Sequence, residues 1–334
     1  MKVLVLGGAG YIGSHAVIEL LKDNNEVVIM DNLSTGQKSN IQTKAKFYKG
    51  DITKKKDLVK VFSAECATKP FDVVMHFAAK LLVNESVSEP LSYYYNNVEG
   101  VRLMLETMVE FNIKNVIFSS TAAVYGAPEK DICEENDLLK PINPYGETKL
   151  ACERLIKWVA SAHNVNYGIF RYFNVAGADD KLKAGYNYNR QTITHLIPIV
   201  TEVALGYREK LNVFGDDYNT PDGTCIRDYI HVSDLARAHV LGAEYLMKKK
   251  ESFIANLGSN DGYSVKEIIN ATEKIKPIKY TISERREGDP DKLIASNVQA
   301  KSILAWEPKF DIYEIIKSDI AYRTKIANKV KFTR

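Results

Sequence analysis

Tyr145 and Lys149 stand one helical turn apart, a spacing that can convert a phenol into a base. Pro144 suits the first position of a helix capped by Asn143, so the two side chains should share one face of that helix. A phenol with an ordinary pKa of about 10 is protonated at neutral pH, and a nearby ammonium favours its charged form. The pair therefore predicts proton transfer to and from a substrate. Taken alone, the same spacing also fits an ordinary exposed i,i+4 contact.

A glycine-rich turn near the start of the chain predicts a phosphate cradle. It contains Gly7, Gly8, Gly10 and Gly13. The pattern fits the dinucleotide fingerprint G-x-G-x-x-G and its variant G-x-x-G-x-x-G, in which side chains would block a pyrophosphate. The amides of Tyr11 and Ile12, at the start of the following helix, can then donate hydrogen bonds to phosphate oxygens. Together with Tyr145 and Lys149, this turn predicts a nicotinamide cofactor and hydride chemistry.

Two acidic positions refine the prediction of a dinucleotide. Asp31 ends the second apolar run, where a carboxylate can accept hydrogen bonds from ribose hydroxyls. The 2′-phosphate of NADP would meet like charge there, with no arginine close in sequence, so NAD is the predicted cofactor. Asp51 and Ile52 follow a third strand-like run and could hold the adenine. The residues support a simple helix cap at Asp51 equally well.

The elements that must position these residues alternate along the first half of the chain. Apolar runs predict buried strands over residues 2–6, 26–30, 73–77, 116–118 and 167–170. Helical spacing of apolar residues predicts helices over residues 12–21, 55–63, 97–110 and 149–162. This order is typical of an α/β fold with a doubly wound parallel sheet. Ligands of such sheets bind beyond the carboxyl ends of the strands.

The chain of 334 residues exceeds what one hydrophobic core usually serves, which favours two domains. Loops rich in Gly, Asn, Asp and Tyr begin after Asn174, at residues 176–191 and 215–223. We predict an NAD-binding domain over residues 1–175 and a smaller α/β substrate-binding domain over residues 176–334. Part of residues 226–258 is expected to pack back on the first domain.

Composition excludes several classes of protein. The net charge of +3 is small, and the charged and hydrophobic fractions of 26% and 45% are those of a globular protein, so neither nucleic-acid binding nor disorder is predicted. The sequence shows no signal peptide or membrane span. The cysteines form no Cys-x-x-Cys pair and the histidines lack ligand spacing, so no disulfide framework or metal site is predicted. A cytoplasmic location is expected.

An ordered set of motifs extends over nearly the whole chain and carries a resemblance. The motifs occupy residues 7–15, 31–32, 51–52, 76–79, 94–98, 119–126, 143–149, 171–178, 222–239, 256–265 and 286–289. With them the chain resembles the extended short-chain dehydrogenases and, among these, the UDP-glucose 4-epimerases, which interconvert UDP-glucose and UDP-galactose. The resemblance implies a Rossmann-type fold, tightly bound NAD, a UDP-hexose substrate and a homodimer built from helices of the first domain.

The resemblance also implies site residues. Tyr145, Lys149 and Thr121 correspond to the catalytic trio, in which the phenolate takes the proton of the sugar 4-hydroxyl and a transient 4-keto sugar presents its other face before reduction. Besides Tyr145 and Lys149, the implied cofactor contacts are Gly7, Gly10, Tyr11, Ile12, Gly13, Asp31, Asn32, Leu33, Ser34, Thr35, Gly36, Asp51, Ile52, Phe77, Ala78, Ala79, Lys80, Leu81, Asn96 and Phe173. Besides Thr121 and Tyr145, the implied substrate contacts are Asn174, Leu196, Asn212, Phe214, Arg227, Tyr229, Arg286, Asp289 and Leu293.

Several positions depart from the pattern of the resembling proteins. Thr121 stands where serine is more frequent, and Ser296 replaces a common acidic residue. Leu81 occupies the position where a lysine is often found, and Lys80 stands one place before it. Leu293 stands where proteins that exclude N-acetylated sugars tend to carry tyrosine, so acceptance of UDP-N-acetylhexosamines stays open. Two other functions also stay open. The first is a 4,6-dehydratase, which would need an acid and a base after Thr121, where the chain has two alanines. The second is an NAD-binding protein without turnover.

Overall fold

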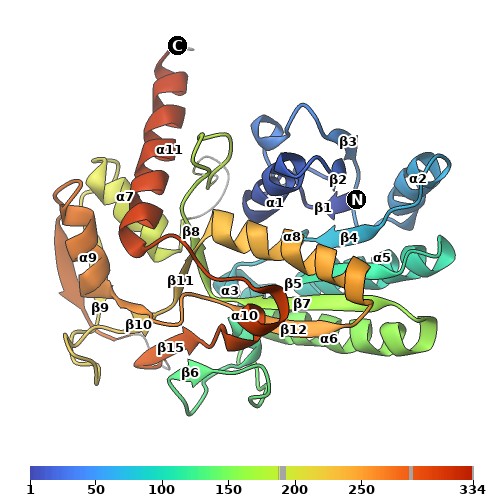
Figure 1. The fold of residues 1–334 in the computed structure, drawn as a ribbon. Helices are drawn as coiled ribbons and strands as arrows, with labels where there is room; N and C mark the ends of the chain where they lie inside the picture. Colours follow the sequence, from blue (N-terminus) through green and yellow to red (C-terminus); the bar gives the residue numbers. More distant parts are fainter. Residues whose placement is uncertain (187, 189–192, 286–288, 333–334) are drawn as a thin grey trace.

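A parallel seven-stranded sheet forms the centre of the computed structural model, which describes the chain except residues 187, 189–192, 286–288 and 333–334 (Figure 1). The strand order is β12-β7-β5-β4-β1-β2-β3. Their bounds are β1 Lys2–Leu6, β2 Glu26–Asp31, β3 Lys46–Lys49, β4 Val73–His76, β5 Asn115–Thr121, β7 Asn166–Tyr172 and β12 Phe253–Leu257. The order steps outward in both directions from β1, which is the arrangement of a doubly wound sheet.

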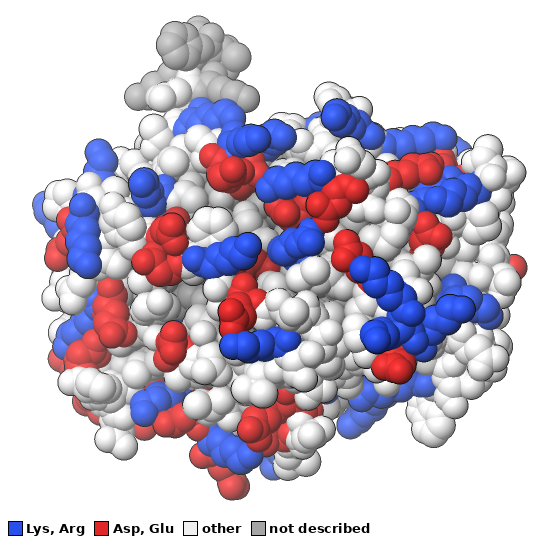
Figure 2. Space-filling view, viewed as in Figure 1, with Lys and Arg blue, Asp and Glu red and all other residues white. Residues whose placement is uncertain are grey.

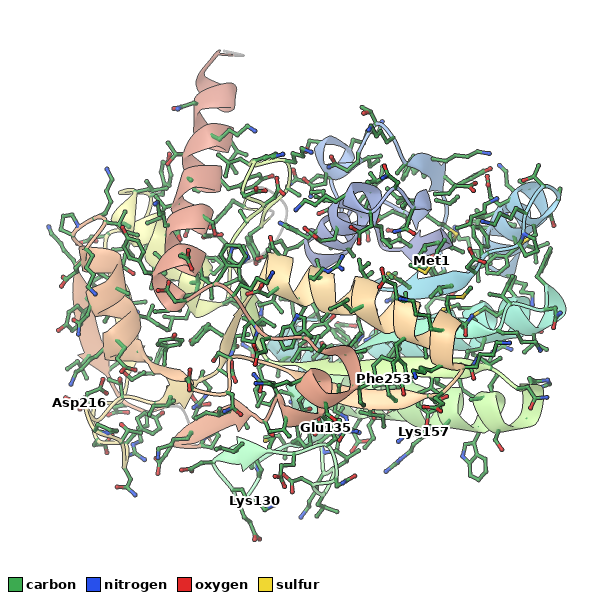
Figure 3. All side chains as sticks on the ribbon, viewed as in Figure 1. Met1, Lys130, Glu135, Lys157, Asp216 and Phe253 are labelled. Carbon is green, nitrogen blue, oxygen red and sulfur yellow. The ribbon has the colours of Figure 1, made fainter. Side chains whose placement is uncertain are left out.

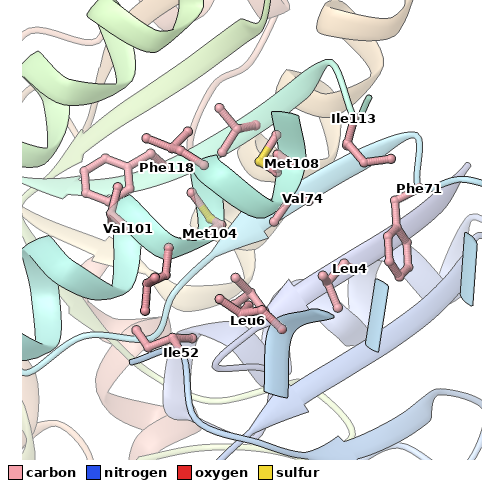
Figure 4. Close-up of a cluster of buried hydrophobic side chains, with 14 of the residues drawn as sticks. Leu4, Leu6, Ile52, Phe71, Val74, Val101, Met104, Met108, Ile113 and Phe118 are labelled. Carbon is pink, nitrogen blue, oxygen red and sulfur yellow. The ribbon is translucent and has the colours of Figure 1, made fainter. Parts of the chain in front are cut away.

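Helices cover both faces of this sheet because successive strand residues point to opposite sides. Leu4 and Leu6 of β1 belong to a core with α2, α5 and α6, whereas Val3 and Val5 belong to a core with α1 and α8. Figure 4 shows the first core, in which Met104 of α5 lies among buried strand residues. The helices associated with the sheet are α1 Tyr11–Lys22, α2 Lys55–Cys66, α3 Val83–Ser88, α4 Pro90–Tyr93, α5 Gly100–Glu110, α6 Pro144–His163 and α8 Val232–Lys249.

A smaller mixed α/β region lies beside one end of the sheet (Figure 1). Its strands are β6 Ile132–Cys133, β8 Asn174–Ala176, β9 Leu211–Phe214, β10 Ile226–Arg227, β11 Tyr229–His231, β13 Tyr263–Ser264, β14 Tyr280–Ser283 and β15 Lys292–Ala295. Its helices are α7 Leu196–Ala204, α9 Val265–Glu273 and α11 Ile312–Phe332, whereas α10 Val298–Leu304 shares the apolar cluster of α8 and the large sheet. Residues of α7, α9 and α11 share one buried apolar cluster. The end of α11 extends beyond the rest of the molecule.

The predicted parallel α/β sheet is confirmed: β1 has the predicted bounds, and the other predicted strands are present but longer or shorter by a few residues. The predicted helix over residues 97–110 is divided between α5 and the π-helix Tyr94–Glu99, which joins α4 to α5 and whose π geometry the sequence pattern did not predict. Short 3-10 turns lie at Lys38–Asn40 and Ala122–Val124. After the mixed region begins, the chain returns to the large sheet, because α8 packs on it and β12 pairs with β7 at its edge.

The described residues limit two further classes of site. None of their helices combines the length and apolar composition needed to cross a membrane. Nor do they contain a group of three or more histidine, cysteine or acidic side chains that could bind a metal ion. On the face shown in Figure 2, basic and acidic side chains are interspersed over most of the surface, and several basic side chains adjoin one another towards the right-hand edge.

Candidate functional site

The first turn of α6 is placed against the carboxyl end of β5. Asn143 caps the helix, its side-chain oxygen accepting a hydrogen bond of 2.9 Å from the amide of Gly146, and Pro144 follows the cap. A Cβ on Gly146 would lie 2.6 Å from the carbonyl oxygen of Ala123, so only glycine allows the helix to approach this closely. Tyr145 therefore lies beside Thr121, the last residue of β5, and the two hydroxyls form a hydrogen bond.

Lys149 is fully enclosed one turn further along α6. Its side chain is 3% exposed, and its Nζ donates a hydrogen bond of 2.8 Å to the carbonyl oxygen of Ser119 on β5. The same nitrogen lies 4.9 Å from the centre of the Phe118 ring. Burial lowers the pKa of Lys149 to about 8, although Cys152 and Glu153 oppose this shift. The ammonium is thus poised to lose its proton close to neutral pH.

The expected effect of Lys149 on Tyr145 is wrong for this arrangement. Burial raises the pKa of Tyr145 to about 12, and the hydrogen bond from Thr121 only partly offsets that rise. The ammonium of Lys149 is directed to the Ser119 carbonyl, and desolvation is the largest influence on the pKa of the phenol. Further positive charge beside the ring is needed before the phenolate can form near neutral pH.

The glycine-rich turn has the shape of a pyrophosphate cradle. Gly7 has φ 81°, and a Cβ there would lie 2.7 Å from the amide nitrogen of Ala78. A Cβ on Gly13 would lie 2.3 Å from the carbonyl oxygen of Gly7, so α1 and the turn approach each other closely. Gly10 caps α1 without a side chain, which leaves the first amides of the helix, from Tyr11 onward, open to an anion. These features fit the pyrophosphate of a dinucleotide.

Asp31 and Asp51 lie at the carboxyl ends of neighbouring strands. Asp31 accepts hydrogen bonds from the amides of Leu33, at 2.7 Å, and Ala9, at 3.0 Å. A carboxylate has further lone pairs for two ribose hydroxyls. Asp51 accepts from both the amide and the hydroxyl of Thr53, whereas α2 is capped by Lys54. The helix-cap interpretation of Asp51 is therefore wrong. The rest of the predicted segment Asn32–Gly36 forms the loop directly after β2.

A hub that the sequence did not reveal connects the loop after β4 to α6. Asn97, in the π-helix, is 2% exposed and accepts a hydrogen bond of 2.9 Å from the amide of Lys80. Its side-chain amide donates to the carbonyl of Lys80 and to the hydroxyl of Thr148. The predicted contact Asn96 donates to Asn97 in turn. A π-turn often marks a functional site, but no local sequence signal identifies one.

Lys80, which stands one place before the position where a lysine was expected, forms an ion pair. Lys80 Nζ lies 3.0 Å from Glu85 Oε1 on α3 and 5.5 Å from the centre of the Tyr93 ring, while Leu81 is 41% exposed. The predicted contacts Phe77, Ala78 and Ala79 directly follow β4 and precede this pair. Ala78 reaches the glycine-rich turn, as its amide lies closest to Gly7. The loop after β4 thus lies against the predicted cradle.

Three predicted substrate residues meet at one small cavity. Asn174, Leu196 and Tyr229 line it, together with His195, which the sequence did not indicate as a site residue. Asn174 is fixed by a hydrogen bond of 2.9 Å from its side-chain amide to the carbonyl oxygen of Asp228. Phe173 is buried in a cluster with Ala122, and Leu293 packs on the same cluster. Leu293 therefore packs on the cluster to which the turn after Thr121 contributes Ala122.

Arg227, one of the two arginines predicted to bind a diphosphate, forms an ion pair with a residue distant in sequence. Arg227 Nη2 lies 3.0 Å from Asp289 Oδ1, and both side chains are less than half exposed. Its sequence neighbour Asp228 is instead fully buried and accepts hydrogen bonds from the amides of Ser259 and Ala295. Asn212 and Phe214 lie on β9, where the Asn212 side chain accepts from Thr281. Arg286 lies outside the described residues.

The comparisons with known proteins agree with this architecture. Residues 3–258 match the model of the NAD dependent epimerase/dehydratase family. A UDP-glucose 4-epimerase of Halalkalibacterium halodurans is 48% identical over 94% of this chain and 92% of its own. One of Streptococcus mutans is 46% identical over 97% of both chains.

Solved structures are also similar over almost their whole length. A crystal structure of UDP-glucose 4-epimerase shares 48% identity with a TM-score of 0.94, covering 98% of this chain and 99% of that one. The enzyme of Bifidobacterium longum, in complex with NAD+ and UDP, gives a TM-score of 0.90 at 37% identity, with 98% and 99% covered. The UDP-Glc/GlcNAc 4-epimerase of Campylobacter jejuni gives 0.86 at 39% identity, with 97% and 99% covered.

Proposed function

The chain belongs to the NAD-dependent epimerase/dehydratase family, and we propose that it is a UDP-glucose 4-epimerase that interconverts UDP-glucose and UDP-galactose. The observation that carries the proposal is the meeting of Thr121, Tyr145 and Lys149 at the carboxyl end of β5, in a chain whose glycine-rich turn fits a dinucleotide. Epimerases of this name, 41–48% identical, cover more than nine-tenths of the chain.

Each of the three side chains has a role in moving the proton of the sugar 4-hydroxyl. Tyr145 accepts this proton as the sugar becomes a 4-keto intermediate and returns it after the sugar has turned its other face. Thr121 donates to the phenol and can bridge it to the sugar oxygen. Lys149 supplies fixed positive charge from within the protein. When bound, NAD takes up and returns the hydride at C4 and adds the positive charge that the buried phenol requires.

The division of labour follows the fold. We infer that residues 1–175 hold NAD through the glycine-rich turn, Asp31, Asp51 and the loop after β4. Residues 176–334 hold the UDP-sugar, apart from α8 and β12, which pack with the first unit. Arg227 and Arg286 bind the diphosphate because a planar guanidinium can donate paired hydrogen bonds to phosphate oxygens. When the substrate binds, Arg227 either leaves Asp289 to bind the diphosphate or contacts both groups at once.

We propose that UDP-N-acetylhexosamines are substrates as well. Leu293 packs against the cluster that contains Phe173 and Ala122. A leucine occupies less space than the tyrosine that restricts some relatives, and a change of one side chain shifts such a preference by about 1 to 3 kcal/mol. The similar C. jejuni structure is of a UDP-Glc/GlcNAc 4-epimerase. Turnover of acetylated and plain UDP-hexoses, compared between the natural chain and Leu293→Tyr, tests this specificity.

We also infer a cytoplasmic homodimer. Large apolar side chains are exposed on adjoining helices of the first half: Leu91 of α4 at 85%, Tyr95 of the π-helix at 60% and Trp158 of α6 at 77%. Such a patch is typical of a subunit interface. The cysteines are free thiols, as expected in a reducing compartment. Sedimentation at increasing protein concentration measures the state of association, with Trp158→Glu as the disrupting variant.

A direct assay tests the proposed reaction. The purified protein is incubated with UDP-galactose without added NAD and is then removed. The UDP-glucose formed is measured afterwards with UDP-glucose dehydrogenase and NAD. We expect conversion without added NAD, because the cofactor is returned unchanged in each cycle. A 4,6-dehydratase would instead form a 4-keto-6-deoxy sugar, and an NAD-binding protein without turnover would leave the substrate intact; either result would refute the proposal.

A further inference from the structure

A buried ion pair lies directly beneath the catalytic side chains. Arg171 of β7 and Glu153 of α6 are joined by two parallel hydrogen bonds, from Nε to Oε1 at 3.0 Å and from Nη2 to Oε2 at 2.7 Å. Both side chains are at most 1% exposed. Ser120 of β5 donates a third hydrogen bond, of 2.5 Å, to Glu153 Oε1. The carboxylate is thus fully bonded and joins three elements.

The position of this carboxylate relates it to the reacting groups. Glu153 lies two turns after Tyr145 and one turn after Lys149, so all three share one face of α6. Ser120, which binds it, directly precedes Thr121, and Arg171 is the register partner of Ser120 on the neighbouring strand. Contacts at Glu153 therefore fix how far α6 is rotated and advanced relative to the end of β5.

The arginine continues the network into the turn after Thr121. Arg171 Nη1 donates to the hydroxyl of Tyr125, at 3.1 Å, and to the carbonyl oxygen of Glu135, at 2.9 Å. Tyr125 in turn donates to Asn256 Oδ1 of β12, at 2.6 Å. Figure 3 labels Glu135, on the segment that follows β6. Both segments that carry the reacting hydroxyls are therefore held by one buried network.

Stability alone is a weak reason for such a pair. Apolar residues of similar volume often replace a buried ion pair at no cost in stability, because desolvation offsets the attraction. Directional hydrogen bonds, in contrast, hold two elements in one relative position. Building on the proposed function, we propose that Glu153 is a positioning residue that, through Ser120 and Arg171, holds Tyr145 and Lys149 in register with Thr121.

The charge of Glu153 gives this role a measurable signature. Its negative charge favours the ammonium of Lys149. In Glu153→Gln, Arg171 keeps its charge without a counterion, so net positive charge is added beside Lys149 and Tyr145. Lys149 should then lose its proton at lower pH, and the phenol should ionise at lower pH. We expect both titrations to move down by about half to one pH unit.

The experiment compares Glu153→Gln with a matched control, Glu65→Gln. Glu65 of α2 forms another buried pair, 3.0 Å from Lys2 Nζ, on a different part of the fold. In Glu153→Gln we expect kcat to fall about tenfold or more, KM for UDP-galactose to change less than about threefold, and the alkaline limb of the pH profile to move to lower pH. In Glu65→Gln we expect kcat within about twofold of the natural chain. Ser120→Ala, which removes one hydrogen bond, should give a smaller loss of kcat. If Glu153→Gln does not fold, Ser120→Ala still tests the proposal.

A readout independent of activity completes the test. The ionisation of Tyr145 is measured as the absorbance difference between each protein and its Tyr145→Phe counterpart during an alkaline titration. An unshifted phenol with normal kcat in Glu153→Gln would overturn the proposal, as would a normal kcat in Ser120→Ala or an equal loss of kcat in Glu65→Gln. If the natural chain does not convert UDP-galactose, the proposed function fails, while the phenol titration still reports on Glu153.

Discussion

Thr121 and Tyr145 join the end of β5 to the first turn of α6 through their hydroxyl groups. This hydrogen bond lowers the pKa of a phenol that burial raises to about 12. It depends on Asn143 as helix cap and on the close approach of Gly146 to Ala123. The reactivity of Tyr145 thus depends on where β5 ends and α6 begins.

Removal of the Thr121 hydroxyl should weaken this base. Thr121→Val keeps the shape of the side chain but cannot donate to the phenol, so we expect kcat to fall about 10- to 1,000-fold. Thr121→Ser keeps the hydroxyl and should stay within about fivefold of the natural chain. Steady-state kinetics with UDP-galactose measure both variants. Equal rates for valine and serine would show that the hydroxyl takes no part.

The pH profile should report the buried ammonium. Burial lowers the pKa of Lys149 to about 8, so its positive charge is complete below that pH and is lost above it. We expect kcat/KM to decline as pH rises through about 8 to 9. In Lys149→Met, which has no charge to lose, activity should be low throughout and this decline absent. The measurement is kcat/KM of both proteins between pH 6 and 10. If the decline persists in Lys149→Met, it is caused by the titration of another group.

The glycine cradle can be tested with a matched pair of variants. Gly7 and Gly206 share the left-handed backbone, with φ 81° and 74°, but only Gly7 is crowded, a Cβ there lying 2.7 Å from Ala78. In both alanine variants, backbone strain should lower the free energy of unfolding by about 1 kcal/mol. Gly7→Ala alone should lose bound NAD, measured after denaturation of the purified protein. Full NAD content in Gly7→Ala would contradict the cradle.

Asp319 of α11 should make stability depend on pH. It accepts hydrogen bonds from Tyr188 and, at 2.7 Å, from Thr201, and burial raises its pKa to about 6. The folded state therefore holds a proton that the unfolded chain releases near pH 4, so this group stabilises the fold at low pH and loses that contribution as pH rises through 6. Asn accepts the same bonds without charge. Asp319→Asn should stabilise the fold by about 1 to 3 kcal/mol at pH 7.5 and by less at pH 5, as measured by urea unfolding.

Local patterns predicted the layers of the sheet and the start of the active helix. The apolar run of β1 and the Asn143-Pro144 cap each lie within a few consecutive residues. Long-range features could not be predicted in this way. The pairing of Arg227 with Asp289 and the hub at Asn97 both join segments distant in sequence. The pKa of Tyr145 was predicted with the wrong sign because spacing shows the neighbouring charge but not the depth of burial.

We propose that Tyr145 is the group that carries the proton of the sugar. The most direct test is Tyr145→Phe, purified beside the natural chain and measured both for bound NAD and for conversion of UDP-galactose. We predict that the variant keeps its NAD, because the glycine cradle is untouched, while kcat falls by about three orders of magnitude or more. Turnover within tenfold of the natural chain, at equal NAD content, would contradict the central claim.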